Sequence, residues 1–157
     1  GYSFRYGDVE FIALNTNHTF QKGSEQRDWL VEVLEASEAT WKVVLFHHPP
    51  YSCNPRRKPG NTRVQKLLVP LFEEYGVDLV LLGHDHLYGR SRDVNGVRYI
   101  ITGGGGAGTY RGAPDSINEV CLREHHYCRI DVYPDLMELV SINIDGEEID
   151  RLMLTKE

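Results

Sequence analysis

Short apolar runs and two helical stripes set the pattern of this chain. The runs at residues 9–14, 41–46, 77–82 and 97–102 are rich in β-branched, leucine and aromatic residues and have the length of strands. The run at 77–82 is nearly continuous, which indicates a strand covered on both faces, as in a parallel sheet. Between the first two runs, apolar residues recur at helical spacing over residues 25–35. The pattern predicts strands that alternate with helices.

The predicted helices begin and end at residues suited to those places. Ser24 and Asn61 each precede a helical stripe and are candidate N-caps. Pro70 falls inside the second stripe and should kink or shorten that helix, and Gly76 suits its C-terminal end. A strand lies on either side of this second helix, so the unit is βαβ, and its usual right-handed crossover would place the two strands side by side.

The last third of the chain predicts antiparallel strands. They span residues 125–132, 136–144 and 149–154, and turn sequences separate them. No internal repeat, linker or low-complexity segment interrupts the chain. We therefore predict one domain, residues 1–157, of the α/β (α+β) class, in which mixed sheet layers are flanked by helices.

Histidines directly follow two of the predicted strands. His47 and His48 follow the second strand, and His84 and His86 follow Gly83 at the end of the third. Carboxyl ends of neighbouring parallel strands meet at one edge, where ligands bind in open α/β sheets. Imidazole nitrogen is a good ligand for zinc and iron. A His-x-His pair alone is equally typical of a surface loop, but histidines at two neighbouring strand ends would let three of them converge on a metal ion.

Cationic residues and a further histidine are candidates for contact with substrate. His48 would point away from His47 if strand geometry continued, so we expect it to support the ligands or to face substrate. The loop at residues 51–60 carries Arg56 and Arg57, and an arginine fork suits bidentate contact with a phosphoryl group. A solvated basic loop is the alternative. We take His48, Arg56 and Arg57 as substrate-binding candidates.

Two further segments suggest sites at first sight. Residues 103–108 satisfy the spacing G-x-G-x-x-G, but no helix signal follows them, so we reject a dinucleotide site and expect a glycine loop beside the metal site. His126 shares a strand face with Cys128 and Ile130, and we expect it to be a buried, hydrogen-bonded histidine. The chain has three cysteines, Cys53, Cys121 and Cys128. One disulfide bond among them is possible and none is required, and we interpret Cys53 as an incidental thiol.

The motifs resemble, in their order, the carboxyl-terminal half of calcineurin-like metallophosphoesterases, and most closely the purple acid phosphatase-like branch. They read LFHHPPYS at 45–52, YGVDLVLLGHDH at 75–86 and YIITGGGGA at 99–107. The resemblance implies the second half of a four-layer α/β/β/α fold and hydrolysis of a phosphomonoester or phosphodiester by a metal-activated hydroxide. It implies two divalent or trivalent metal ions, iron, zinc or manganese without distinction. By position, His47 and His84 match ligands of one metal, and His86 matches a ligand of the other.

The resemblance also has a departure. The family's first three motifs, which supply carboxylates, an amide and a histidine, have no counterpart here. Asp8 is better interpreted as a turn residue before a strand, and Gly60 with Asn61 matches only the first two residues of a Gly-Asn-His motif. We therefore expect little activity from the chain as given. The alternative is a non-catalytic fragment or association module that keeps the fold and at most a partial histidine site, paired with a second copy or a complementing amino-terminal segment.

Composition limits the kinds of molecule that this chain is expected to bind. The chain has a net charge of −6, with 41% hydrophobic and 25% charged residues, which is ordinary for a globular domain. An acidic balance argues against a general nucleic-acid or anionic-membrane surface. No apolar run approaches the roughly 18 residues that a membrane-spanning helix needs. The expected partner is a phosphate-ester substrate. The residues do not indicate a compartment, and the resemblance is compatible with an extracytoplasmic one.

Overall fold

The computed structural model describes residues 1–157, which form ten strands and three helices. The helices are α1 Glu25–Ala36, α2 Thr62–Leu67 and α3 Val69–Glu74. The strands are β1 Tyr2–Tyr6, β2 Val9–Ala13, β3 Trp41–Phe46, β4 Leu79–Leu82, β5 Tyr88–Ser91, β6 Arg98–Thr102, β7 Asn118–Leu122, β8 His126–Val132, β9 Leu136–Asn143 and β10 Glu148–Thr155. No helix is long and apolar enough to cross a membrane.

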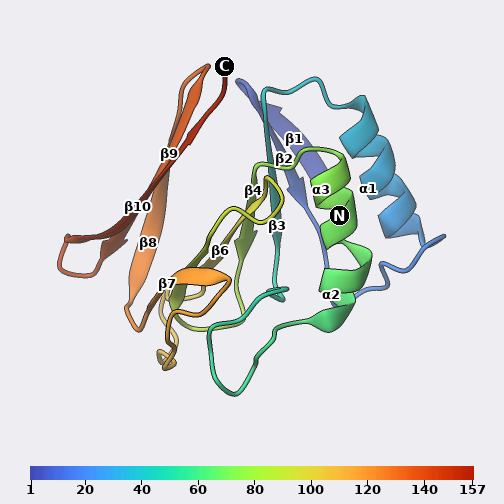
Figure 1. Ribbon diagram of the computed structural model, residues 1–157. Coiled ribbons are helices and arrows are strands. Elements are labelled where there is room, and N and C mark those ends of the chain that lie inside the picture. The colour runs from blue at the N-terminus through green and yellow to red at the C-terminus, as the bar shows by residue number, and fades with distance from the viewer.

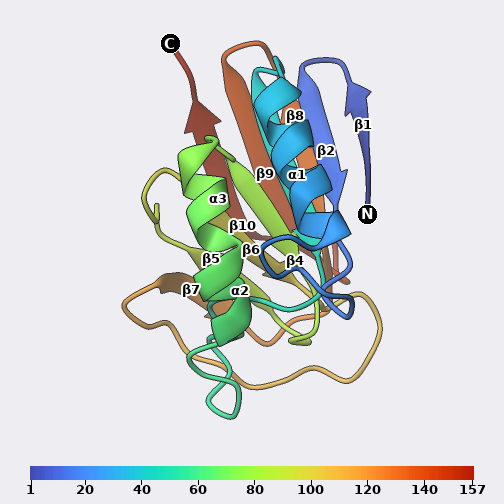
Figure 2. The ribbon, with the colours of Figure 1, turned by 90° about the vertical axis from the view of Figure 1, so that its right-hand side faces the viewer.

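Two sheets and one helical layer make up the fold. The larger sheet has the order β1-β2-β3-β4-β6-β5-β7, and its central strands β2, β3, β4 and β6 are parallel. The smaller sheet, β10-β9-β8, is antiparallel. The helices cover one face of the larger sheet and the smaller sheet covers the other (Figures 1 and 2). The predicted α/β class with mixed sheet layers flanked by helices is confirmed.

An apolar core lies on each side of the larger sheet. Leu30, Leu34 and Phe72 belong to the core under the helices, and Trp41 and Met137 belong to the core between the sheets. These side chains are at most 1% exposed, and full burial of such a group stabilises a fold by roughly 1.5–3 kcal/mol. The central strands are thus fixed from both faces, and so is the edge where they end.

A polar network also joins the two sheets. Asp150 on β10 accepts hydrogen bonds from the Tyr88 hydroxyl and from Arg90 Nε on β5, both at 2.6 Å. Burial, with the neighbouring Asp150, raises the pKa of Tyr88 well above its usual value, so the phenol stays a donor. His126 packs edge-on against Tyr88, with ring centroids 5.3 Å apart. Tyr88, Arg90 and Asp150 are called the intersheet network below.

Local signals predicted most element ends. The side chains of Ser24 and Asn61 accept hydrogen bonds from the backbone of Arg27 and Val64, so both N-caps are confirmed. The helix that contains Pro70 is divided into α2 and α3. Strands β1, β5 and β7 were not predicted.

Two expectations for the carboxyl-terminal part of the chain are also confirmed. His126 is buried, and its ring nitrogens lie 2.9 Å from Thr102 Oγ1 and 3.0 Å from the Glu124 carbonyl oxygen. Residues 103–108 form a loop that no helix follows, as the missing helix signal after them predicted.

Candidate functional site

Three histidines meet at the carboxyl ends of β3 and β4. The ligand atoms of His47, His48 and His84 all lie within 4.8 Å of one another. His84 Nδ1 is 3.2 Å from His47 Nε2. Two imidazole nitrogens that bind one tetrahedral zinc at about 2.0–2.1 Å lie roughly 3.3 Å apart. The spacing of His47 and His84 therefore fits a single metal ion. These three residues are called the histidine cluster below.

His48 joins this cluster because the strand ends before it. Strand β3 stops at Phe46, and residues 47 and 48 form a bend, so the side-chain alternation of a strand does not continue. The expectation that His48 points away from His47 depended on that continuation and is wrong. His48 Nδ1 lies 2.7 Å from Thr16 Oγ1, which orients the ring.

The turn after β4 is shaped around the His47 ring. His84 has φ 67°, in the left-handed region that non-glycine residues rarely occupy. A Cβ at Gly83 would lie 3.2 Å from His47 Nδ1, so glycine lets the turn pass close to the imidazole. Backbone strain of about 1–3 kcal/mol is typically found at functional sites.

His86 lies outside the histidine cluster. Its Nδ1 is 3.0 Å from the carbonyl oxygen of Gly108, and its ring stacks on Tyr110 with centroids 4.3 Å apart. A carbonyl only accepts, so Nδ1 carries the hydrogen and Nε2 keeps its lone pair. The structure brings His47 and His84 together, as expected, but adds His48 to them in place of His86.

A buried carboxylate ties the two ligand-bearing loops together. Asp85, 1% exposed, accepts from Ser52 Oγ at 2.5 Å and forms an ion pair with Arg57 Nη1 at 3.1 Å. The same Arg57 nitrogen donates to the His84 carbonyl at 3.0 Å. Asp85, Ser52 and Arg57 are called the Asp85 clasp below. Asp85 was not predicted as a site residue, although its place between His84 and His86 was a signal.

Burial and nearby charges favour the neutral form of two of these imidazoles, those of His48 and His84. Burial, followed by the nearby His47 and Arg57, lowers the pKa of His48. Burial and then Arg57 and His48 also lower the pKa of His84, against the opposing effect of Asp85. Neutral imidazole is the form that binds metals, so both side chains are ready for coordination near neutral pH.

Two hollows adjoin these groups. One, of about 220 Å³, is lined by His48, His84 and Asp85 together with Arg57. The other, of about 500 Å³, is lined by Arg56 and again by Arg57. Of the predicted substrate-binding residues, His48 belongs to the histidine cluster and Arg57 lies beside it, whereas Arg56 lines the larger of the two hollows.

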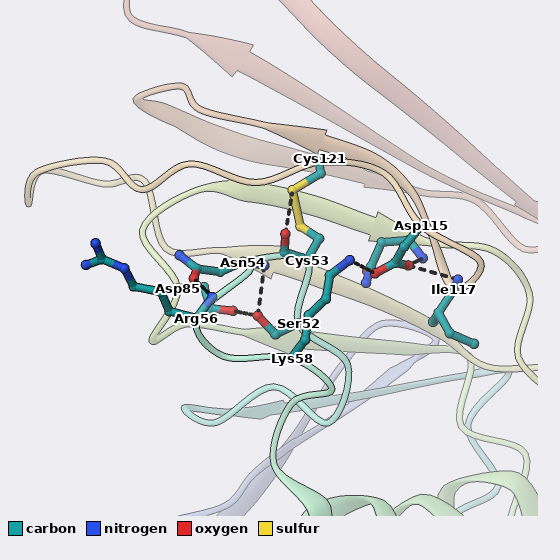
Figure 3. The surroundings of a disulfide bond; sticks show 10 residues. Ser52, Cys53, Asn54, Arg56, Lys58, Asp85, Asp115, Ile117 and Cys121 are labelled. Carbon is teal, nitrogen blue, oxygen red and sulfur yellow. Dashed lines mark hydrogen bonds and ion pairs between the residues drawn. A yellow bond between two sulfur atoms is a disulfide. The ribbon is translucent and has the colours of Figure 1, made fainter.

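A disulfide bond fixes the loop that follows β3. Cys53 is bonded to Cys121 on β7, and Figure 3 shows Ser52 and Asn54 on either side of Cys53. The interpretation of Cys53 as an incidental thiol is wrong, because strand β7, which was not predicted, pairs with β5 and brings Cys121 next to this loop. Cys128 is free.

Comparison with known proteins agrees with this arrangement. The sequence profile of the calcineurin-like phosphoesterases matches residues 2–88. The chain belongs to this family. Its segments are 32% identical to purple acid phosphatase 18 of Arabidopsis thaliana over 97 residues, which cover 60% of this chain and 22% of that protein. They are 35% identical to a purple acid phosphatase of Glycine max over 107 residues, which cover 66% and 23% of the two chains.

Solved structures of this phosphoesterase family share the fold. The structure of purple acid phosphatase PPD1 from yellow lupin seeds superposes with a TM-score of 0.94 at 21% identity, over 99% of this chain and 32% of that one. The fold is therefore that of the matching third of this purple acid phosphatase chain. The chain spans less than a quarter of the length of the curated relatives described above.

Proposed function

We propose that this protein takes part in the hydrolysis of phosphate esters at metal ions held by His47, His84 and His86. The observation that carries the proposal is the meeting of His47, His48 and His84 at the carboxyl ends of two parallel strands, in a chain of the calcineurin-like phosphoesterase family. That edge is where ligands bind in open α/β sheets.

The donor atoms suit the metal ions that the family implies. His47 and His84 would hold one ion, and His86, whose Nε2 is left with a lone pair, would contribute to a second. Bound ions would supply Lewis acidity and an activated water for attack on phosphorus. Histidine nitrogen binds zinc, iron and manganese, so the ligands alone do not select among them.

The remaining groups of the site would orient the phosphoryl group. Arg57 uses Nη1 for Asp85 and for the His84 carbonyl, and its planar fork has further N–H donors for phosphoryl oxygens. His48 lines the same hollow as Arg57 and keeps a neutral ring at neutral pH. Both are placed to contact a substrate held at the cluster.

The test combines metal content with turnover. Elemental analysis would be made on the protein and on the variants His47→Ala and His84→Gly, with hydrolysis of an aryl phosphate followed in the same samples. Glycine at position 84 removes the imidazole and tolerates the left-handed backbone. The exposed His18, which lies outside the cluster, provides the control His18→Ala.

Bound metal with weak turnover, both lost in the two variants and kept in the control, is the expected result. Metal that resists both substitutions would refute the ligand assignment. A folded protein without metal or turnover would refute the hydrolytic proposal and favour the non-catalytic module.

A further inference from the structure

A second cleft lies beside the histidine cluster, and arginines dominate it. It encloses about 500 Å³, and its lining includes Arg56, Arg57, Arg111 and Arg123 but no carboxylate. This volume is that of a small-molecule pocket, although such pockets are usually apolar. The lining here is cationic, which indicates an anionic ligand.

The charge of the cleft is largely uncompensated. The whole chain has a net charge of −6, yet four guanidinium groups gather here. Arg57 forms an ion pair with Asp85, whereas Arg56, Arg111 and Arg123 take part in no ion pair. Like charges around one cleft repel each other, and the attraction of each arginine to a bound anion would offset that repulsion.

Two walls of the cleft are covalently joined. Cys53 directly precedes the segment that carries Arg56, and its partner Cys121 lies two residues before Arg123. The Asn54 side chain accepts from the Arg56 amide at 2.8 Å and holds this segment in a tight turn. Arg56 reaches outward from the loop beside the disulfide (Figure 3). The arginines are therefore presented from a fixed backbone, which lowers the entropic cost of binding.

The third wall is fitted tightly against the same disulfide. A Cβ at Gly112 would lie 2.3 Å from Cys121 Sγ and 3.0 Å from the Cys53 carbonyl oxygen, so only glycine allows this approach. Beside it, Thr109 Oγ1 accepts from Arg123 Nε at 3.1 Å. The cleft is thus built by contacts among its own walls.

The cleft is continuous with the candidate metal site through two residues. Arg57 lines both the cleft and the hollow at the histidine cluster. Tyr110, on the wall of the cleft, lies under the Arg57 guanidinium at 5.1 Å and stacks on His86 at 4.3 Å. A substrate with one phosphoryl group at the histidines would therefore extend its remaining part towards the arginines.

We propose that Arg56, Arg57, Arg111 and Arg123 bind a second phosphoryl group of the substrate. The inference rests on the proposed function and names its substrate class: small organic phosphates that carry at least two phosphoryl groups. A phosphoryl group offers three acceptor oxygens and nearly two negative charges, which match planar guanidinium forks better than one carboxylate does.

Binding to the metal-free protein tests the cleft independently of turnover. Titration calorimetry would compare inorganic tripolyphosphate with inorganic phosphate and with citrate, which offers carboxylates only. The variant would be Arg111→Gln/Arg123→Gln, two exposed side chains outside the Asp85 clasp. The control is Arg92→Gln, because Arg92 is exposed and lies beyond β5 at the opposite end of the sheet.

Tripolyphosphate should bind more tightly than phosphate or citrate, and the double variant should weaken it roughly 100-fold, tenfold for each charged hydrogen-bond donor lost. The control should change less than twofold. Unchanged binding in the double variant, or equal binding of citrate and tripolyphosphate, would overturn the proposal.

The two proposals fail in different ways. Tripolyphosphate binding that depends on the arginines, in a protein without metal or turnover, would support the cleft and refute the proposed function. If the protein binds metal and shows turnover, but the double variant keeps its tripolyphosphate affinity, only the proposal for the cleft is refuted. When both hold, the double variant should lose kcat/KM for an aryl bisphosphate and not for an aryl monophosphate.

Discussion

Two carboxylates, the buried Asp85 and the partly buried Asp150, hold different parts of this molecule together. Asp85 and Asp150 are each bound by one arginine and one hydroxyl group, with Arg57 at the first and Arg90 at the second. Asp85 joins two loops at the edge where the histidine cluster lies. Asp150 joins the smaller sheet to the larger one. The same chemistry thus serves site geometry in one region and sheet packing in the other.

The difference indicates that stability and site geometry depend on separate contacts. In the Asp85 clasp, Arg57 reaches both the carboxylate and the His84 carbonyl, so the clasp acts directly on a predicted ligand. The intersheet network includes no residue of the histidine cluster. Substitutions in the clasp should therefore change metal affinity most, and substitutions in the network should change the free energy of unfolding most.

The largest effect on stability is expected from the disulfide on the side of the clasp. The variant Cys53→Ser/Cys121→Ser should lose about 4 kcal/mol in the free energy of unfolding, because the bond closes a long loop in the unfolded chain. The sequence separation is 68 residues. Metal content of the folded protein should persist, since the clasp remains. Urea unfolding measures the change, and Cys128→Ser, at the free cysteine, is the control; equal stability of the two variants would contradict the prediction.

Breaking the intersheet network should be nearly as costly. Arg90→Met leaves the Asp150 carboxylate with Tyr88 alone and should lower the free energy of unfolding by about 3 kcal/mol. Metal affinity should not change. The exposed pair of Arg129 with Asp131 offers the control Arg129→Met, which should cost less than about 1 kcal/mol. A loss of metal in Arg90→Met would show that the two regions are not separate.

The clasp should reveal itself in metal affinity. Asp85→Asn keeps the shape of the side chain but removes the charge that holds Arg57, so the turn at His84 loosens. Loss of such a supporting contact typically weakens metal binding 10–100-fold. Competition with a chromophoric chelator would measure it. Asp150→Asn is the matched control, and equal affinities in the two variants would contradict the comparison.

The smallest predicted effect concerns pH. Burial lowers the pKa of His126 in the folded protein, so the unfolded chain binds more protons as pH falls below about 6.5. The free energy of unfolding of the metal-free protein should therefore be constant above about pH 6.5. Below that pH it should decrease until the pH reaches the lowered pKa of His126. Denaturant unfolding across pH 5–8 would measure the slope. His126→Gln should reduce the slope without abolishing it, because the pKa values of His48 and His84 are lowered too, and an unchanged slope would contradict the prediction.

The parallel core and the position of the site could be predicted because their signals are local. Caps at Ser24 and Asn61, the break at Pro70 and the apolar runs define a βαβ unit, and that unit alone brings His47 and His84 to one edge. His48 was predicted as a substrate-binding candidate, but its position next to His47 and His84 was not, because that position depends on where β3 ends.

The rest depends on pairings between distant segments. Strand β5 contains Gly89 and a charged residue, and β7 has Asn118 and Glu119 at its start, so neither has the composition of a strand. Their pairing brings Cys121 to Cys53 and Arg123 to the other arginines. Because the pairing of β5 with β7 was not predicted, neither the disulfide nor the arginine cleft could be predicted.

The left-handed backbone of His84 restricts how a lineage can abandon this site. Most side chains would inherit the strain of that conformation without the benefit of a ligand, whereas glycine, asparagine and aspartate tolerate it. Descendants that lose the metal should therefore drift towards those three residues at this position before any others. The residue type at this position would then still reflect the left-handed backbone after the proposed metal site had been lost.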